Sequence, residues 1–177
     1  MAGRTERVRH IIQGEHCVSD APDEVISTIL GSCVAACIYD PLSRIGGANH
    51  FLLSDPGNGP VDIRYAAAAM EVLVNSLLRR GAQKRRLEAK LFGGARIMRN
   101  LPDIGGANAK AAEKFLRDEG IPVISSDLGG EQARRMRFWP TTGRVQIQRL
   151  APQNALPAEA PRPRQTSNFE LFDGADG

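Results

Sequence analysis

The chain has 177 residues, of which 42% are hydrophobic and 24% charged, as is ordinary for one soluble globular domain with a proper core. No apolar stretch approaches the length of a membrane span, and the polar start MAGRTERVRH lacks the apolar segment of a secretory signal. The net charge of +3 is mild, and its densest run, Lys84-Arg85-Arg86, contains no aromatic residue, so nucleic acid is not an expected partner. Three cysteines, an odd number, do not suggest a disulfide scaffold, so we expect a cytoplasmic protein with reduced thiols.

The chain is expected to begin with one or two short strands between residues 7 and 18, around Gln13-Gly14. A zinc site could be sought in the cysteines and histidines that start here, which are His16, Cys17, Cys33, Cys37 and His50. No CxxC pair exists, and the spacings fit no structural zinc module. We therefore expect no metal and no other cofactor.

The next stretch predicts a strand followed by a β-hairpin. Val25 to Leu30 is rich in β-branched residues and indicates a short strand, which Gly31-Ser32 ends immediately before Cys33. Val34 to Tyr39 is a nearly continuous apolar run, which is typical of a strand buried on both faces. Turn residues follow it, and Ala48 to Leu53 then supplies the returning strand.

The turn length of this hairpin decides where His50 lies relative to Cys33. A two-residue turn at Pro41-Leu42 pairs Cys33 directly with His50. A four-residue loop from Pro41 to Arg44 pairs Ala35 with His50 instead, and Cys33 is then the diagonal neighbour on the same face. Direct pairs lie about 5 Å apart at Cβ and diagonal pairs about 7 Å apart, so the two side chains can meet in either register.

A cysteine within reach of a histidine is the minimal thiol nucleophile, because the imidazole can take the thiol proton and the thiolate can then attack. A buried cysteine also commonly serves as a small hydrophobic residue, and a lone histidine is often structural. Spacing alone leaves both interpretations open. A redox pair of Cys33 and Cys37 is a third possibility, but a separation of four along a strand corresponds to roughly 13 Å, too far for a disulfide without rearrangement.

Two helices follow the hairpin and a loop at residues 55–59. Tyr65 to Arg80 has apolar residues at three- and four-residue spacing and predicts a helix, with Gly81 at its C-cap. Asn108 to Glu119 predicts a second amphipathic helix, with Asn108 as its N-cap and Gly120 at its end. Further strands are expected at residues 87–92, 121–125 and 144–150. Strands grouped early with two helices interspersed favour an α+β fold, a single layered domain of mixed β-sheets with two main helices.

Two further segments have readings that the sequence leaves open. Gly93-Gly94 either lets backbone approach the active site closely or is only a tight turn. From Ala151 the composition becomes proline-rich, so residues 1–150 are expected to form the domain and residues 151–177 a disordered tail. An isolated apolar cluster, NFELF, occupies residues 168–172 of that tail.

Several sequence motifs occur in a fixed order along the chain. They are LGSCVAACIYDP and GGANHFLL around the hairpin, EAKLFGGARIM at 88–98, IGGAN at 104–108, and DLGG, RRMRF and TG between 127 and 143. Together they resemble the signature of the CheD family, the chemoreceptor glutamine deamidases of bacterial chemotaxis. The resemblance covers about residues 7 to 150, and the separation of Cys33 from His50 matches the family's catalytic pair.

The resemblance implies roles for individual residues. It makes Cys33 the nucleophile and His50 the general base in the hydrolytic deamidation of receptor glutamine side chains to glutamate, and the same chemistry would cleave a glutamate methyl ester. The family's third catalytic position, a threonine six residues before the cysteine, falls on Ser27, with Thr28 as its immediate neighbour. We assign the role to Ser27. The Gly31 turn makes the backbone N–H groups of Ser32 and Cys33 candidates for binding the oxyanion, and Thr28 is a candidate for positioning the substrate.

The resemblance also implies partners. Methyl-accepting chemoreceptors would be the substrate, and a CheC-type phosphatase is a possible partner. The alternative to an enzyme is a non-enzymatic adaptor that binds this phosphatase in chemotactic adaptation. The segment at 168–172 is similar to the aromatic pentapeptide by which some chemoreceptor tails tether their modifying enzymes, although an inert tail is the competing interpretation.

Overall fold

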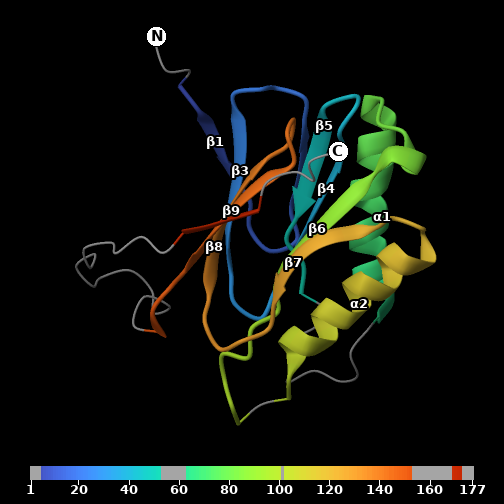
Figure 1. Ribbon diagram of the computed structural model, residues 1–177. Helices are drawn as coiled ribbons and strands as arrows, with labels where there is room; N and C mark the ends of the chain where they lie inside the picture. The colour runs from blue at the N-terminus through green and yellow to red at the C-terminus, as the bar shows by residue number, and fades with distance from the viewer. Residues whose placement is uncertain (1–4, 53–62, 101, 153–168, 173–177) are drawn as a thin grey trace.

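The computed structural model describes residues 5–52, 63–100, 102–152 and 169–172 (Figure 1). The loop expected at residues 55–59 lies outside these ranges, as do residues 153–168 and 173–177 of the expected tail. Among the described residues, no helix combines the length and the apolar character needed to cross a membrane.

Within the described ranges, ten strands form two sheets of five. The first sheet has the order β1 (Arg7–His10), β3 (Glu24–Leu30), β8 (Arg134–Trp139), β9 (Arg144–Arg149), β10 (Phe169–Phe172). The second has the order β2 (His16–Ser19), β5 (Ile45–Asn49), β4 (Val34–Asp40), β6 (Glu88–Gly93), β7 (Val123–Leu128). Both sheets are mixed, because β1 runs parallel to β3 and β6 runs parallel to β7, whereas the other neighbours are antiparallel.

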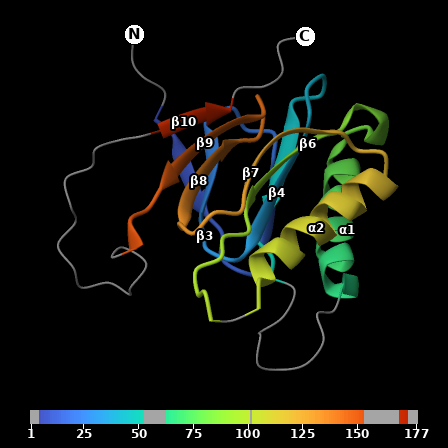
Figure 2. The ribbon, with the colours of Figure 1, turned by 60° about the horizontal axis from the view of Figure 1, so that its bottom comes forward.

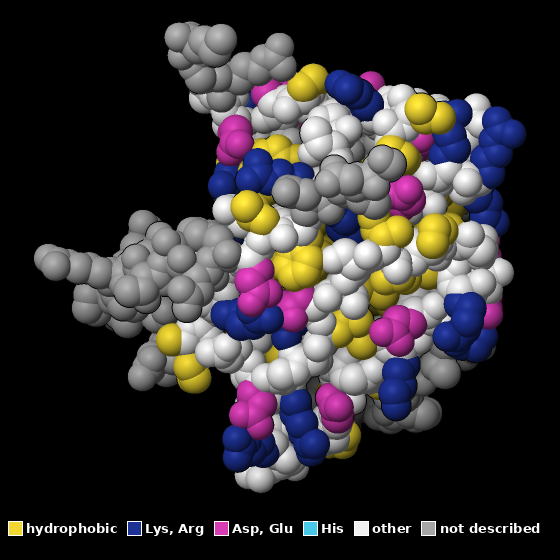
Figure 3. Space-filling view, viewed as in Figure 1, with side chains coloured by type: hydrophobic (Ala, Val, Ile, Leu, Met, Phe, Trp, Pro, Cys, Tyr) yellow, Lys and Arg dark blue, Asp and Glu magenta, His cyan; other side chains and the backbone are white. Residues whose placement is uncertain are grey.

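The sheets and helices form three layers. Helices α1 (Ile63–Arg80) and α2 (Ile104–Asp118) cover one face of the second sheet, and the first sheet lies against its other face (Figures 1 and 2). A short 3₁₀ helix, η1 (Lys84–Arg86), precedes β6. The inter-sheet core, between the two sheets, includes Ile26, Leu30, Ala35, Cys37, Phe92, Met136 and Phe138. A second core, here called the helix-side core, lies between the second sheet and the helices. Basic and acidic side chains are interspersed on the surface seen in Figure 3.

The α+β class with two main helices is confirmed, but one helix start was predicted wrongly. Helix α2 begins at Ile104, where the Asp103 carboxylate accepts a hydrogen bond of 2.9 Å from Gly106 N. Asn108 is therefore inside the helix, fully buried, and is not its N-cap. Two glycines in the first turn of α2 have low helix propensity, which is why the sequence pattern placed the start one turn late.

Strands β8 and β10 were not predicted. β10 lies in the tail that was expected to be disordered, and it pairs with β9 at the edge of the first sheet. The Phe172 ring packs edge-on against Phe92 with centroids 5.5 Å apart, and its carbonyl accepts a hydrogen bond of 2.9 Å from Lys90 Nζ. The Phe172 ring and the salt-bridged Glu170 thus give this segment partners that composition alone does not reveal.

The β4–β5 hairpin adopts the longer of the two registers considered. Asp40 pairs with Ile45, so residues 41–44 form a four-residue loop. Asp40 itself is fully buried. Its carboxylate accepts hydrogen bonds from Leu42 N and Ser43 N in the loop and from Gln83 N, which directly precedes η1. Arg86 adds an ion pair of 2.9 Å. Burial alone would raise the pKa of the Asp40 carboxyl, but these donors outweigh it and hold that pKa well below its ordinary value.

The Asp40 cluster should contribute measurably to stability. Asp40→Asn removes the charge that Arg86 and three backbone N–H groups share, and we expect the free energy of unfolding in urea to fall by about 2 kcal/mol at pH 7. Because the folded-state pKa is lowered, this contribution exists above the unfolded value of 3.8 and should shrink as the pH falls below it.

Asp118→Asn is the matched control, since Asp118 is exposed and pairs with the exposed Lys114, and it should leave the free energy of unfolding close to the wild-type value. Equal losses for the two variants at pH 7 would contradict a stabilising role of the Asp40 cluster.

Candidate active site

Cys33 lies at the junction of the two sheets. It follows the Gly31-Ser32 turn that leads from β3 in the first sheet to β4 in the second. Its half-buried thiol borders a hollow of about 570 Å³, here called the thiol cleft, whose lining includes Ile29, Ser32, Leu52, Ala95, Ile97 and Ile104. Burial raises the pKa of the Cys33 thiol to about 11, so the thiol is protonated at neutral pH.

His50 is held in one orientation by Thr28. The imidazole is only 7% exposed, and its Nδ1 lies 2.7 Å from Thr28 Oγ1. The single proton of the Thr28 hydroxyl goes to the carbonyl of Ile11, also at 2.7 Å, so this oxygen must accept the Nδ1–H of His50. The lone pair of the neutral imidazole is thereby placed on Nε2. Burial lowers the pKa of His50, which keeps this neutral form populated at pH 7.

Cys33 and His50 lie on the same face of the β4–β5 hairpin. Val34 and Phe51 form an antiparallel bridge, with N–H···O bonds of 3.0 and 2.9 Å in the two directions, and both side chains belong to the helix-side core. Cys33 precedes Val34 and His50 precedes Phe51, so their side chains point to the opposite face, toward the first sheet. In this register the two are diagonal neighbours, about 7 Å apart at Cβ.

The thiol and the imidazole border two adjoining hollows. His50 and Thr28 line a hollow of about 640 Å³, here called the imidazole cleft, whose rim includes Arg135 and Arg137. Ile29 lines both clefts and is 52% exposed, so the two clefts share an apolar wall residue.

The hydroxyl beside His50 belongs to Thr28. The family resemblance had placed the third catalytic position on the neighbouring Ser27. Along β3, Thr28 alternates in phase with Ile26 and Leu30, which point into the inter-sheet core. Ser27 points to the other face of the strand, where it pairs with His10 and Arg137 of the neighbouring strands. The alternation of core residues along residues 26–30 was the signal that could have identified Thr28.

Glycines let backbone pack closely around the thiol turn. Gly94 N donates to Cys33 O at 2.8 Å, and Ala95 N donates to Gly31 O at 3.0 Å. Gly93 has φ +106°, and a Cβ at this position would collide with the Cys33 carbonyl oxygen. Of the two readings left open for Gly93-Gly94, the structure therefore shows the close approach of backbone to the Cys33 turn.

Two polar residues that sequence reasoning did not place in the site hold this backbone. Asn108 donates from Nδ2 to Ser32 O at 2.9 Å, which ties helix α2 to the residue before the thiol. Arg134, buried on β8, donates to Gly93 O at 2.9 Å and also to the carbonyls of Asp127 and Gly129. The motifs IGGAN and RRMRF contain these two residues, but neither motif by itself reveals a contact with residues 31–33 or 93–94.

Gln13 is the third residue that sequence reasoning missed. Its Oε1 lies 3.9 Å from Cys33 Sγ, and it lines the imidazole cleft together with His50.

All three cysteines are free thiols, and Cys37 is fully buried in the inter-sheet core. Within the described ranges, no three His, Cys, Asp or Glu side chains gather in a way that could hold a metal ion.

Comparisons with known proteins agree on one family. The family model described as CheD chemotactic sensory transduction matches residues 45–149. A protein of Caulobacter vibrioides (strain NA1000 / CB15N), named a probable chemoreceptor glutamine deamidase CheD, is 55% identical over 157 residues, which is 87% of this chain and 83% of that protein. A protein of the same name from Rhizobium leguminosarum bv. trifolii (strain WSM2304) is 48% identical over 96% of this chain and 98% of its own.

A solved structure, the hypothetical protein YfiH of Bacillus licheniformis, superposes with a TM-score of 0.46 at 15% identity, over 70% of this chain and 60% of that one. The identity of this chain to the two relatives above is much higher than its identity to this structure. A family model that covers more than half of the chain, together with relatives 48% and 55% identical over most of its length, shows that this chain belongs to the CheD family.

Proposed function

We propose that this chain hydrolyses the side-chain amide of glutamine residues in chemoreceptors, giving glutamate and ammonia, with Cys33 as the nucleophile. The relatives bear the name chemoreceptor glutamine deamidase, which supports the substrate class. The observation that carries the mechanism is the Thr28–His50 hydrogen bond, because it leaves the Nε2 lone pair free on the face of the hairpin that also bears Cys33. The activity is assigned to residues 1–150.

The first half of the proposed reaction forms a thioester. His50 Nε2 takes the thiol proton as Sγ attacks the glutamine Cδ, and the carbonyl oxygen becomes an oxyanion. Backbone N–H groups of the Gly31–Cys33 turn are the candidate donors to this oxyanion, since the carbonyls of the turn are held by Gly94, Ala95 and Asn108. The C–N bond then breaks, and the imidazolium of His50 gives its proton to the departing ammonia.

The second half consumes water. His50 removes a proton from a water molecule that attacks the thioester carbon, and the C–S bond breaks as the thiolate regains that proton from the imidazolium. The balance is one glutamine side chain and one water converted to one glutamate and one ammonia. A glutamate methyl ester would follow the same steps with methanol as the leaving group, so methylesterase activity is a secondary proposal.

The resting state in this mechanism is a neutral pair. Burial raises the pKa of Cys33 and lowers that of His50, so both groups are uncharged at pH 7 and no thiolate–imidazolium pair is formed in advance. The thiol proton therefore moves only as the substrate is attacked.

Binding of a CheC-type phosphatase is a separate proposal that rests on the family resemblance alone.

The nucleophile can be tested by mass spectrometry of receptor cytoplasmic fragments. Cys33→Ala should abolish the gain of about 1 Da that accompanies conversion of glutamine to glutamate. Cys37→Ala is the control, because Cys37 is fully buried in the inter-sheet core and should leave most of the activity. Deamidation by Cys33→Ala at the wild-type rate would remove Cys33 from the mechanism.

The hydroxyl can be tested by comparing neighbouring positions on β3. Thr28→Val removes the acceptor of the His50 Nδ1–H while keeping the branched shape. We expect kcat to fall by roughly tenfold to 10²-fold, the upper value being the loss expected when a general base is removed. Ser27→Ala alters the opposite face of the strand and should change kcat by less than about twofold.

Thr28→Ser keeps the hydroxyl and should restore most of the activity lost in Thr28→Val. A larger loss for Ser27→Ala than for Thr28→Val would show that the hydroxyl has been assigned to the wrong residue.

A further inference from the structure

The turn between β1 and β2 is fastened directly to the backbone of His50. Gly14 N donates to His50 O at 2.8 Å, and His50 N donates to Glu15 O at 3.1 Å. The Glu15 side chain closes the turn by accepting from Ile12 N at 2.8 Å. Gly14 has φ +89°, a conformation that glycine adopts readily. The position of Gln13, at the tip of this turn, is therefore fixed relative to the imidazole.

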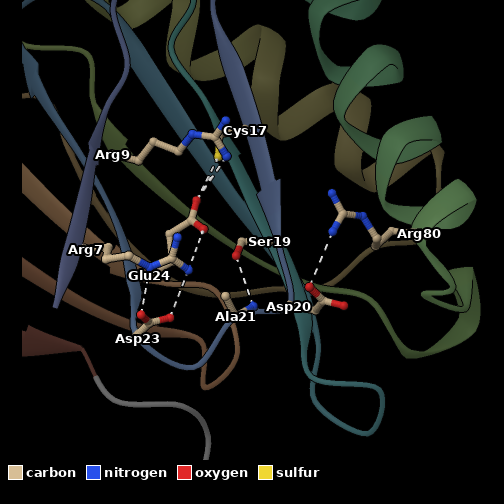
Figure 4. A network of polar contacts seen from close by, with 9 residues as sticks. All are labelled: Arg7, Arg9, Cys17, Ser19, Asp20, Ala21, Asp23, Glu24 and Arg80. Atoms are coloured by element: carbon tan, nitrogen blue, oxygen red, sulfur yellow. Dashed lines mark hydrogen bonds and ion pairs between the residues drawn. The ribbon is translucent and has the colours of Figure 1, made fainter. Parts of the chain in front are cut away.

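The strand before the turn is anchored independently at its other end. Arg7 pairs with Asp23 at 2.7 Å and Arg9 pairs with Glu24 at 3.1 Å, which fastens β1 to the start of β3 (Figure 4). At the turn end, Ile11 N donates to Ser27 O at 3.0 Å, and Ile11 O accepts the Thr28 hydroxyl. These contacts hold β1 beside β3 over its whole length, so the turn that bears Gln13 has a defined backbone.

The side chain of Gln13 brings a carboxamide to the thiol. Its Oε1 is 3.9 Å from Cys33 Sγ and stands in the position of an acceptor for the thiol proton. In the proposed reaction this proton leaves for His50, and Oε1 then loses its donor at the moment of attack. A substrate carboxamide bound at Sγ carries two N–H donors, whereas a glutamate carboxylate or a methyl ester carries none.

We propose that Gln13 is a substrate-positioning residue that selects a carboxamide at the thiol, by accepting an N–H of the substrate amide on Oε1. This inference rests on the proposed function, because it takes Cys33 as the nucleophile. The hydrogen bond to Gln13 orients the leaving nitrogen toward Gln13 and the substrate carbonyl toward the Gly31–Cys33 turn. It also favours release of the product, because the glutamate carboxylate has only acceptors to set against Oε1. A site built around a hydrogen bond to the substrate disfavours analogues that lack the donor, so the secondary methylesterase reaction should be slower than deamidation.

Alkylation of Cys33 tests this acceptor without relying on deamidation. Iodoacetamide and iodoacetate each form an S–C bond and expel iodide, while the thiol proton passes to His50, but only iodoacetamide offers N–H donors. The measured quantity is the ratio of the two rate constants at Cys33, followed by mass spectrometry of its peptide. In Gln13→Met, which keeps the length but loses the acceptor, the iodoacetamide-to-iodoacetate ratio should fall by roughly fivefold, as expected for one hydrogen bond.

Several controls make the result decisive. Gln13→Leu is a second variant without the acceptor and should lower the ratio as Gln13→Met does. Gln132→Met changes an exposed glutamine that lines neither cleft and should leave the ratio at the wild-type value. A purely structural role of Gln13 would slow both reagents alike, so an unchanged ratio in both Gln13 variants overturns the proposal.

Deamidation of receptor fragments separates the two hypotheses. If the wild type alkylates with the expected preference but deamidates no receptor glutamine, the proposed function fails and the acceptor role of Gln13 stands. If the wild type deamidates and Gln13→Met does so with unchanged KM and an unchanged alkylation ratio, Gln13 does not position the substrate. Conversion of Gln13 itself to glutamate in the wild type, absent in Cys33→Ala, would make it a substrate and would also overturn the proposal.

Discussion

The hydrogen bond between Thr28 and His50 joins the two sheets at the candidate active site. Thr28 belongs to β3 of the first sheet, and His50 follows β5 of the second, so their separation of 2.7 Å depends on how the sheets pack. Ile26 and Leu30 flank Thr28 in the inter-sheet core, which fixes the strand face that bears its hydroxyl. Because that hydroxyl donates to Ile11 O, it can only accept from the imidazole, and the tautomer of His50 is set by the fold.

The thiol is placed by the same junction. Cys33 lies in the turn that carries the chain from one sheet to the other, and close packing holds this turn from the side of β6 and α2. The absence of a side chain at Gly93 and Gly105 allows that packing, since a Cβ at either position would meet a carbonyl oxygen. Burial then keeps both the thiol and the imidazole neutral. In the proposed mechanism, this neutral pair transfers the thiol proton only as the substrate amide is attacked.

Much of this could be predicted from the sequence, and the failures have physical causes. Apolar runs and turn residues located β3, β4 and both helices, and hairpin geometry reduced the relation of Cys33 to His50 to two registers. The choice between these registers depended on the buried Asp40 carboxylate, whose partners Gln83 and Arg86 are distant in sequence. Counting residues from the cysteine pointed to Ser27, whereas the hydroxyl that contacts His50 belongs to Thr28, because such counting ignores which strand face meets the second sheet. Strand β10 depends on Phe92 and Lys90, which no local pattern connects to the tail.

The central claim is that the fold holds His50 as the neutral Nδ1–H tautomer, with Nε2 available to the thiol. Nitrogen NMR of the uniformly ¹⁵N-labelled protein tests this directly, because long-range couplings to the imidazole ring protons distinguish a protonated nitrogen from one that bears a lone pair. At pH 7 the account predicts a protonated Nδ1 and an unprotonated Nε2 for His50, with titration only below its ordinary pKa of 6.5. An Nε2–H tautomer, or an imidazolium at pH 7, would contradict it.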